Sequence, residues 1–193
     1  MNRLEHIDQA ITLWINSFHS PLTDQFWIFL SDVRIWFLAY GIIIVMMFVR
    51  LGWKKGVVVL LSCILAVVLA DQISYHIKEG VMRLRPCYTT WMLENGLHWP
   101  LPRYSFFGFF SGHASNAFAF IACSLTGFRS NDSRHRYQAY MLAGYVWAAL
   151  VALSRIMMAA HYFGDVLVGI CFGLLVGYGL GFLSRAIIVK ARL

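Results

Sequence analysis

Residues 56–70 read GVVVLLSCILAVVLA, a stretch without a single charged side chain. A helix needs about 20 mostly apolar residues to cross the hydrocarbon core of a bilayer, within a range of roughly 17–25. This stretch reaches that length with a few flanking residues, and so does the charge-free stretch IWFLAYGIIIVMMFV at residues 35–49. Two such stretches in succession indicate a chain that is built from membrane-spanning helices.

Three more apolar stretches follow, at residues 114–128, 137–154 and 166–184. The sequence therefore predicts an all-α fold, a polytopic membrane helix bundle of about five spanning helices. No linker, repeat or low-complexity tract interrupts the series, so we expect one domain over residues 1–193. Within it, interfacial helices would occupy residues 1–32 and the catalytic helix bundle residues 33–193.

The first 32 residues have a different pattern from the rest. Their apolar side chains fall at helical spacing on one face, and these are Leu4, Ile7, Ile11, Trp14, Ile15 and Phe18. Such a helix is suited to lying in the membrane interface. Ser20 and Pro21 supply an N-cap and an N1 proline for a second short helix over residues 22–31. A sixth span is the alternative, but three aspartates in this region make it costly.

Composition excludes an ordinary soluble enzyme. Only 13% of the residues are charged and 60% are hydrophobic, whereas soluble domains are usually about a quarter charged. The 16 Lys and Arg against 9 Asp and Glu give a formal charge of +7, which in a soluble protein would suggest a nucleic-acid partner. Nine of these cations instead flank the apolar stretches, namely Arg50, Lys54, Lys55, Arg129, Arg134, Arg136, Arg185, Lys190 and Arg192.

The positive-inside rule places such segments in the cytoplasm. We therefore expect a multi-pass protein of the cell (inner) membrane that binds no nucleic acid. Residues 78–111 and the turn at 155–165 would then face the extracytoplasmic side. Ionisable groups near membrane depth are costly and indicate function, and three clusters of them fall on this side.

The three clusters, at residues 78–86, 110–113 and 154–165, all offer groups that bind anions. Lys78, Arg85 and Arg155 provide positive donors, and two of them are guanidinium forks suited to phosphate oxygens. Ser111 and Gly112 stand at the predicted start of a helix, where backbone N–H groups and a hydroxyl form an anion site. Together these residues predict a phosphate-binding cradle.

The last two clusters offer the reacting groups. His161 and Asp165 are four residues apart, so on a helix the carboxylate can reach one imidazole nitrogen. That contact would fix the tautomer and leave the other nitrogen free as a nucleophile. A second histidine, His113, could protonate the leaving oxygen. This set predicts phosphoryl transfer through a phosphohistidine, with no metal and no other cofactor.

The spacing K-x6-R-P, S-G-H and S-R-x5-H-x3-D resembles the signature of the type-2 phosphatidic acid phosphatase superfamily, which also includes vanadium haloperoxidases. The resemblance is to its membrane lipid phosphatase branch, and it implies a metal-independent enzyme. Carried over by position, it implies that Lys78, Arg85 and Arg155 bind phosphate, Ser111 and Gly112 hydrogen-bond it, His113 is the general acid, His161 the nucleophile and Asp165 its partner. One position departs from the pattern, because Phe110 replaces the proline that usually precedes S-G-H.

These observations predict an integral membrane phosphatase that hydrolyses a lipid phosphate or diphosphate at the extracytoplasmic face. Undecaprenyl diphosphate is the first expectation, because recycling of that carrier is the most general need. The alternatives are a lipid A 1-phosphatase or a phosphatidylglycerophosphate or phosphatidic acid phosphatase. An anion transporter or channel is an alternative of a different class. The sequence leaves the oligomeric state open.

Two residues near the motifs allow two interpretations each. Arg83 could contact a second phosphate or a charged headgroup, or it could extend to the surface along the membrane border. Tyr104 could anchor the outer loop at the membrane interface, or it could form part of a lid over the lipid headgroup. Interfacial anchoring is the favoured interpretation of Tyr104.

Overall fold

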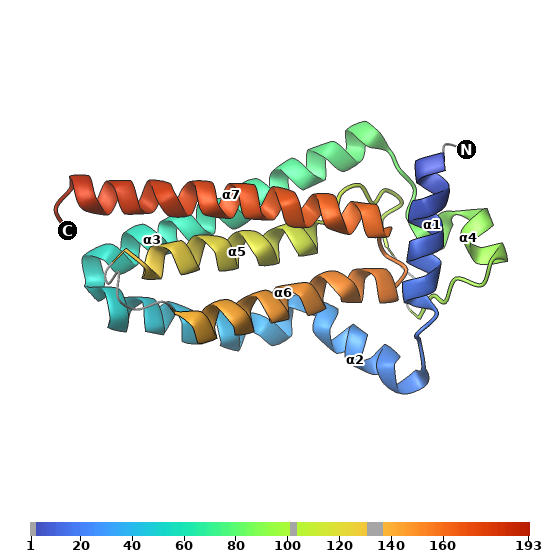
Figure 1. The fold of residues 1–193 in the computed structure, drawn as a ribbon, viewed down its shortest axis with the longest axis horizontal. Helices are drawn as coiled ribbons and strands as arrows, with labels where there is room; N and C mark the ends of the chain where they lie inside the picture. The colour runs from blue at the N-terminus through green and yellow to red at the C-terminus, as the bar shows by residue number, and fades with distance from the viewer. Residues whose placement is uncertain (1–2, 101–103, 131–136) are drawn as a thin grey trace.

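The computed structural model describes residues 3–100, 104–130 and 137–193, and within these ranges the fold is all-α. Four longer helices form the bundle in Figure 1: α3 (Phe37–Val81), α5 (Gly112–Phe128), α6 (Gln138–Met157) and α7 (Phe163–Lys190). The shorter elements are α1 (Arg3–Asn16), α2 (Pro21–Ser31), η1 (Val33–Trp36), η2 (Pro86–Tyr88) and α4 (Thr90–Glu94).

Helix α3 is interrupted at Gly52, whose φ of 76° and ψ of 170° are not helical. Glycine adopts such a positive φ without the steric cost that a Cβ would impose. The two halves of α3 run in opposite directions along the bundle (Figure 1), and the rings of Phe48 and Trp53 stack across the break. The predicted stretches 35–49 and 56–70 are therefore the two halves of one interrupted helix.

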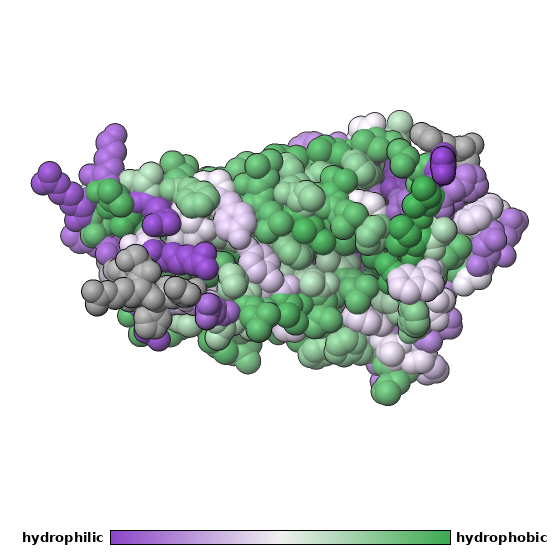
Figure 2. Space-filling view, viewed as in Figure 1, coloured by the Kyte–Doolittle hydropathy of each residue, from purple (hydrophilic) through white to green (hydrophobic). Residues whose placement is uncertain are grey.

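Three helices are long and apolar enough to cross a membrane: Val33–Val81, Gln138–Met157 and Phe163–Lys190. The predicted count of five is thus not reproduced, for two reasons. The break at Gly52 joins two predicted spans into one helix, and the predicted span at 114–128 becomes α5, which has 17 residues, 15 of them buried. Figure 2 shows a hydrophobic band between two hydrophilic ends, as expected for a multi-pass membrane protein.

Helices α5 and α7 approach each other so closely that their backbones touch. Four glycines at every fourth position of α7 face α5, and they are Gly169, Gly173, Gly177 and Gly181. A Cβ on the second or third of these would overlap the carbonyl oxygen of Ser115 or Ala119. Small residues at such spacing let membrane helices pack closely, and here the packing fixes α5 against the start of α7.

The two predicted N-terminal helices are confirmed as helices. Ser20 caps α2 through a reciprocal pair of bonds with Thr23, and Pro21 is its first residue. Helix α1 crosses the end of the bundle that also holds α4 (Figure 1). Its apolar face is exposed, with Trp14 66% accessible, whereas its polar residues Thr12 and Asn16 are buried. The polar face of α1 therefore packs onto the protein.

The break in α3 and the C-terminus lie together at the opposite end of the bundle (Figure 1). Two of the three predicted basic segments, around Lys54 and Lys190, therefore belong to the same end. In the third segment Arg134 and Arg136 lie outside the described residues.

Candidate active site

A cavity of about 610 Å³ opens near the end of the bundle that is crossed by α1. Six of the eight predicted site residues line it: Lys78, Arg85, Gly112, His113, Arg155 and His161. The other two, Ser111 and Asp165, are fully buried beside it. The topology thus brings together residues from α3, α5, α6 and two connecting segments, in a volume typical of small-molecule sites.

Arg85 is fixed in place by hydrogen bonds. Its Nε donates to the Ser105 carbonyl (2.6 Å), its Nη2 to the Ser105 hydroxyl (2.9 Å) and its Nη1 to the Ala160 carbonyl (2.8 Å). The same Nη1 lies 3.1 Å from Nε2 of His161. Because a guanidinium only donates, Nε2 must accept, so its lone pair points towards the cations and the ring proton sits on Nδ1.

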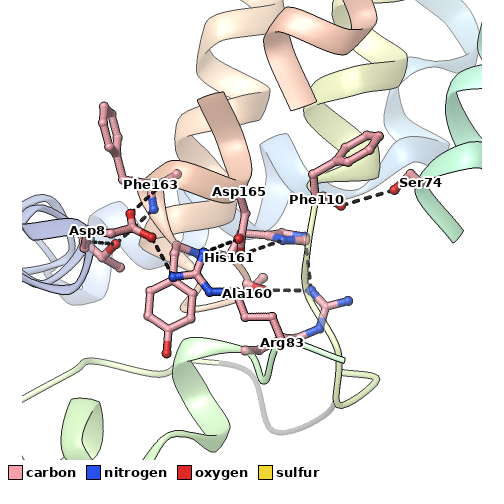
Figure 3. Close-up of polar contacts among 12 residues, drawn as sticks. Asp8, Ser74, Arg83, Phe110, Ala160, His161, Phe163 and Asp165 are labelled. Atoms are coloured by element: carbon pink, nitrogen blue, oxygen red, sulfur yellow. Dashed lines mark hydrogen bonds and ion pairs between the residues drawn. The ribbon is translucent and has the colours of Figure 1, made fainter. Parts of the chain in front are cut away.

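Asp165 lies on the other side of the His161 ring (Figure 3). Its Oδ2 is 3.7 Å from His161 Nδ1, which is longer than a hydrogen bond. Oδ2 accepts from the Tyr162 amide (3.1 Å), and Oδ1 accepts from Arg83 Nη1 (2.6 Å). The predicted His–Asp pair is therefore adjacent but not tightly bonded, and such contacts are often long in unliganded sites.

His161 is 2% exposed and lies in the segment between α6 and α7. Burial lowers the pKa of His161 well below its usual range, and the nearby cations Arg85, Arg155 and Lys78 lower it further. Both effects disfavour the imidazolium. The ring is consequently neutral at physiological pH, as a nitrogen nucleophile must be.

The start of α5 is held by backbone contacts and packing. The Ser111 amide donates to the Asp165 carbonyl (3.0 Å), so of this residue only the buried hydroxyl stays unpaired among the described contacts. A Cβ on Gly112 would lie 3.2 Å from Ser74 Oγ and 3.4 Å from Lys78 Nζ, so glycine fits closely there. Phe110, the residue in the place of the usual proline, is buried and packs against Phe172.

Arg83 adopts neither of the two positions expected from the sequence. Its guanidinium pairs with Asp165 (2.6 Å) and with Asp8 of α1 (2.7 Å), and it lies over the Tyr162 ring. It is not among the residues that line the cavity. A contact between residues 75 positions apart has no local signal in the sequence.

Tyr104 belongs to the cavity, although interfacial anchoring was its favoured interpretation. Its ring centre is 5.4 Å from Cζ of Arg85 and 5.7 Å from Cζ of Arg155, within the range of cation–π contacts. Its position depends on the path of the outer loop, which composition does not predict. Burial raises the pKa of the Tyr104 hydroxyl.

A second hollow of about 370 Å³ borders the cavity. The two share Trp36, Tyr40 and Trp147, and the second is otherwise lined by aliphatic and small residues of α3, α5 and α6 together with Tyr140. We call it the apolar groove. A polar pair lies on the cavity side, where Asn116 Nδ2 donates to Asp71 Oδ1 (3.1 Å). Among the described residues, no three His, Cys, Asp or Glu side chains are grouped to hold a metal ion.

Comparison with known proteins places these features in a family. Residues 55–186 match the PAP2 superfamily. The chain is 26% identical to the lipid A 4'-phosphatase of Porphyromonas gingivalis over 179 residues, which cover 92% of this chain and 73% of that protein. It is 35% identical to phosphatidylglycerophosphatase B of Bacillus subtilis over 102 residues, which cover 51% of this chain and 45% of that protein.

Two solved structures share the fold. The crystal structure of a PAP2-type phosphatidylglycerolphosphate phosphatase from Bacillus subtilis matches with a TM-score of 0.73 at 23% identity, covering 98% of this chain and 88% of that one. The crystal structure of Aquifex aeolicus LpxE matches with a TM-score of 0.63 at 20% identity, covering 92% and 93%.

Proposed function

Because the chain belongs to the PAP2 superfamily, as a membrane lipid phosphatase, we propose that it hydrolyses a lipid phosphate through a phosphohistidine formed on His161. The observation that carries the proposal is the position of Nε2, whose lone pair faces the cations of the cavity, 3.1 Å from Arg85 Nη1. Lys78, Arg85 and Arg155 bind the three peripheral phosphate oxygens. The arriving phosphate takes over the Arg85 donor and frees Nε2 to attack.

The reaction has two steps. In the first, Nε2 of His161 attacks phosphorus, the bond to the lipid oxygen breaks, and His113 gives a proton to that oxygen. In the second, water attacks phosphorus, the P–N bond breaks, and His113 takes the proton of the water. Asp165 stabilises the Nδ1–H that becomes more acidic as Nε2 is phosphorylated. Ser111 and Gly112 hydrogen-bond the phosphate, and no metal takes part.

The apolar groove supports a lipid substrate. It borders the cavity and shares Trp36, Tyr40 and Trp147 with it, so a phosphate in the cavity and a hydrocarbon chain in the groove can belong to one molecule. The groove lies between α3 and α6, both of which are apolar enough to cross a membrane. The tail of the substrate can therefore stay in the bilayer during the reaction.

We take a lipid phosphomonoester as the preferred substrate. The relatives are named for lipid A 4'-phosphate and for phosphatidylglycerophosphate, and three cations suffice for one phosphate. Arg83, the extra cation that a second phosphate would need, is engaged by Asp165 and Asp8. Asp71 adds a negative charge to the cavity wall. Undecaprenyl diphosphate remains the second candidate, because its prenyl tail suits the groove equally well.

We further propose that the chain crosses the membrane five times, twice through the halves of α3 and once each through α5, α6 and α7. The basic segments at the end that holds the α3 break then face the cytoplasm. The cavity opens towards the extracytoplasmic side of the inner membrane.

The test is phosphate release by the purified protein in detergent with EDTA, from phosphatidylglycerophosphate, lipid A, phosphatidic acid and undecaprenyl diphosphate. We expect the monoesters to be cleaved faster, and an acid-labile phosphoenzyme to form. His161→Ala should abolish both, whereas His76→Ala, at an exposed histidine of α3 that does not line the cavity, should be fully active. Activity in His161→Ala would refute the assignment of His161 as the nucleophile. Loss of activity with EDTA would refute metal independence, and faster cleavage of the diphosphate would refute the preference for a phosphomonoester.

A further inference from the structure

The face of α1 that packs onto the protein carries the buried polar residues Gln9, Thr12 and Asn16 and the partly buried Asp8. Asp8, Thr12 and Asn16 follow one another at intervals of one helical turn. Thr12 and Asn16 are 0% and 1% exposed. Burial of polar groups is costly unless hydrogen bonds compensate for it. The contacts of these three side chains therefore indicate what α1 is built to hold.

All three bind the ends of the helices on either side of His161. Asn16 Nδ2 donates to the carbonyls of Ile156 (3.3 Å) and Met157 (3.1 Å), at the end of α6. The amide of Phe163 donates to Thr12 Oγ1 (3.0 Å) and the amide of Gly164 to Asp8 Oδ1 (2.6 Å), at the start of α7. These are backbone groups that helix ends leave without partners. Helix α1 thus fastens both ends of the segment that carries His161.

The same aspartate also reaches the catalytic carboxylate through one side chain. Asp8 Oδ2 accepts from Arg83 Nη2 (2.7 Å), and Arg83 Nη1 donates to Asp165 Oδ1 (2.6 Å). Figure 3 shows the continuous series Asp8, Arg83, Asp165 and His161. Asp165 is 0% exposed, and its other oxygen has only the Tyr162 amide as a hydrogen-bond donor among the described contacts. Arg83 and the Tyr162 amide thus each hold one oxygen of this carboxylate, and Arg83 is the side chain of the two.

We propose that α1 is a working part of the catalytic centre, in which Asp8 holds Arg83 and Arg83 turns the Asp165 carboxylate towards Nδ1 of His161. Asp8 and Arg83 are positioning residues, because neither lines the cavity. The proposal rests on the assignment of His161 as the nucleophile. It makes α1 a required part of the enzyme in addition to its place at the membrane.

Charge gives a signature that a purely structural role would lack. The charged or titratable groups around His161 are Lys78 from α3, Arg85 from the segment before η2, His113 from α5, Arg155 from α6 and Asp165 from α7. Arg83→Gln leaves Asp165 without its counter-ion, so the imidazolium of His161 becomes easier to form. Arg83→Lys keeps the positive charge but loses the planar guanidinium that contacts Asp8 and Asp165 at the same time.

The experiment measures kcat, KM and the pH profile of kcat/KM for these variants on a lipid phosphomonoester. Arg83→Gln should lower kcat at least about tenfold, as loss of a group that orients a catalytic histidine does, with KM within about twofold. In this variant the acidic limb of the kcat/KM profile, where the rate falls as His161 becomes protonated, should move to higher pH. Arg83→Lys should also lose kcat while its acidic limb stays in place.

Asp8→Asn should lower kcat as well, and the double variant Asp8→Asn/Arg83→Gln should be no slower than Arg83→Gln alone. Asp24→Asn is the matched control, because Asp24 of α2 pairs with His98 (2.8 Å) and none of the described contacts joins it directly to Arg83 or Asp165; it should behave as wild type. Melting curves in detergent verify that each variant is folded.

Wild-type kcat and an unmoved acidic limb in Arg83→Gln would overturn the proposal. So would additive losses in the double variant. If Asp8→Asn melts early, the two Arg83 variants still decide the outcome through the pH profile. An inactive wild type would instead refute the proposed function, so the two failures are distinguishable.

Discussion

At the scale of single residues, the site combines a neutral histidine with three cations. The segment that carries His161 is fastened at both ends, and Arg85 is held by Ser105 and Ala160 before any substrate arrives. A phosphate therefore meets donors that are already oriented, which reduces the reorganisation needed in the transition state.

The pH dependence of kcat/KM should reflect this environment. Burial lowers the pKa of His161 below 6.5, the ordinary value for histidine, so the proposed nucleophile stays unprotonated in mildly acidic solution. We expect the acidic limb of kcat/KM to lie below pH 6.5. A group whose pKa is lowered by folding contributes stability above its unfolded pKa and loses it as the pH falls, so the melting temperature should also decrease in acid. An acidic limb above pH 6.5 would contradict the assignment.

At the scale of elements, the contact between α5 and α7 decides how the catalytic groups meet. Helix α5 begins with Gly112 and His113, and α7 carries Asp165 in its first turn. The four glycines of α7 that face α5 let these two helix starts approach closely. The geometry of the site thus depends on residues well below it in the bundle.

Gly177→Leu should destabilise the bundle, because its Cβ would overlap the Ala119 carbonyl and lie 2.8 Å from the Ala122 Cβ. Overpacking of this kind costs about 1–3 kcal/mol. Gly179→Leu is the control, since nothing lies within 4 Å of that position, and it should be neutral or stabilising by up to about 1 kcal/mol. Thermal unfolding in detergent measures both, and equal melting temperatures would contradict the close contact.

The elements also show what a sequence can and cannot predict. The 35–49 and 56–70 stretches, the cap of α2 and the position of the motif residues at helix ends have local signals, and these predictions agree with the structure. The partner of Arg83 is 75 positions away, and Tyr104 reaches the cavity through a loop. Such contacts depend on the path of the chain, so the sequence does not predict the partner of Arg83, and it offers a place for Tyr104 over the headgroup only as the less favoured of two interpretations.

At the scale of the whole molecule, the two ends of the bundle differ in the elements that they carry. One end holds α1, α4 and the cavity, and the other holds the α3 break and the C-terminus (Figure 1). Three basic residues follow or lie within the last turns of α7, and three flank Gly52. In the proposed five-span arrangement, hydrocarbon separates the two ends and each faces a different compartment.

Labelling with a membrane-impermeant maleimide should reveal the orientation. The Glu94→Cys variant, at an exposed position of α4, should react in intact spheroplasts, and the Arg192→Cys variant only after lysis. The wild type is the control. Cys63, Cys87 and Cys123 are buried, and Cys171 is exposed only on the part of α7 that we propose to lie in the hydrocarbon, where the reagent does not enter. The reverse pattern would invert the orientation, and labelling of both from one side would contradict five passes.

The cluster of Lys78, Arg85 and Arg155 has a consequence for turnover. In the proposed reaction, hydrolysis releases the lipid alcohol but leaves inorganic phosphate among the same three cations, and as a dianion this product carries the same charge as the phosphomonoester headgroup. The attraction that draws a substrate headgroup out of the interface thus also slows the departure of the product. The enzyme should therefore run fastest where free phosphate is scarce, and its rate should fall as that product accumulates.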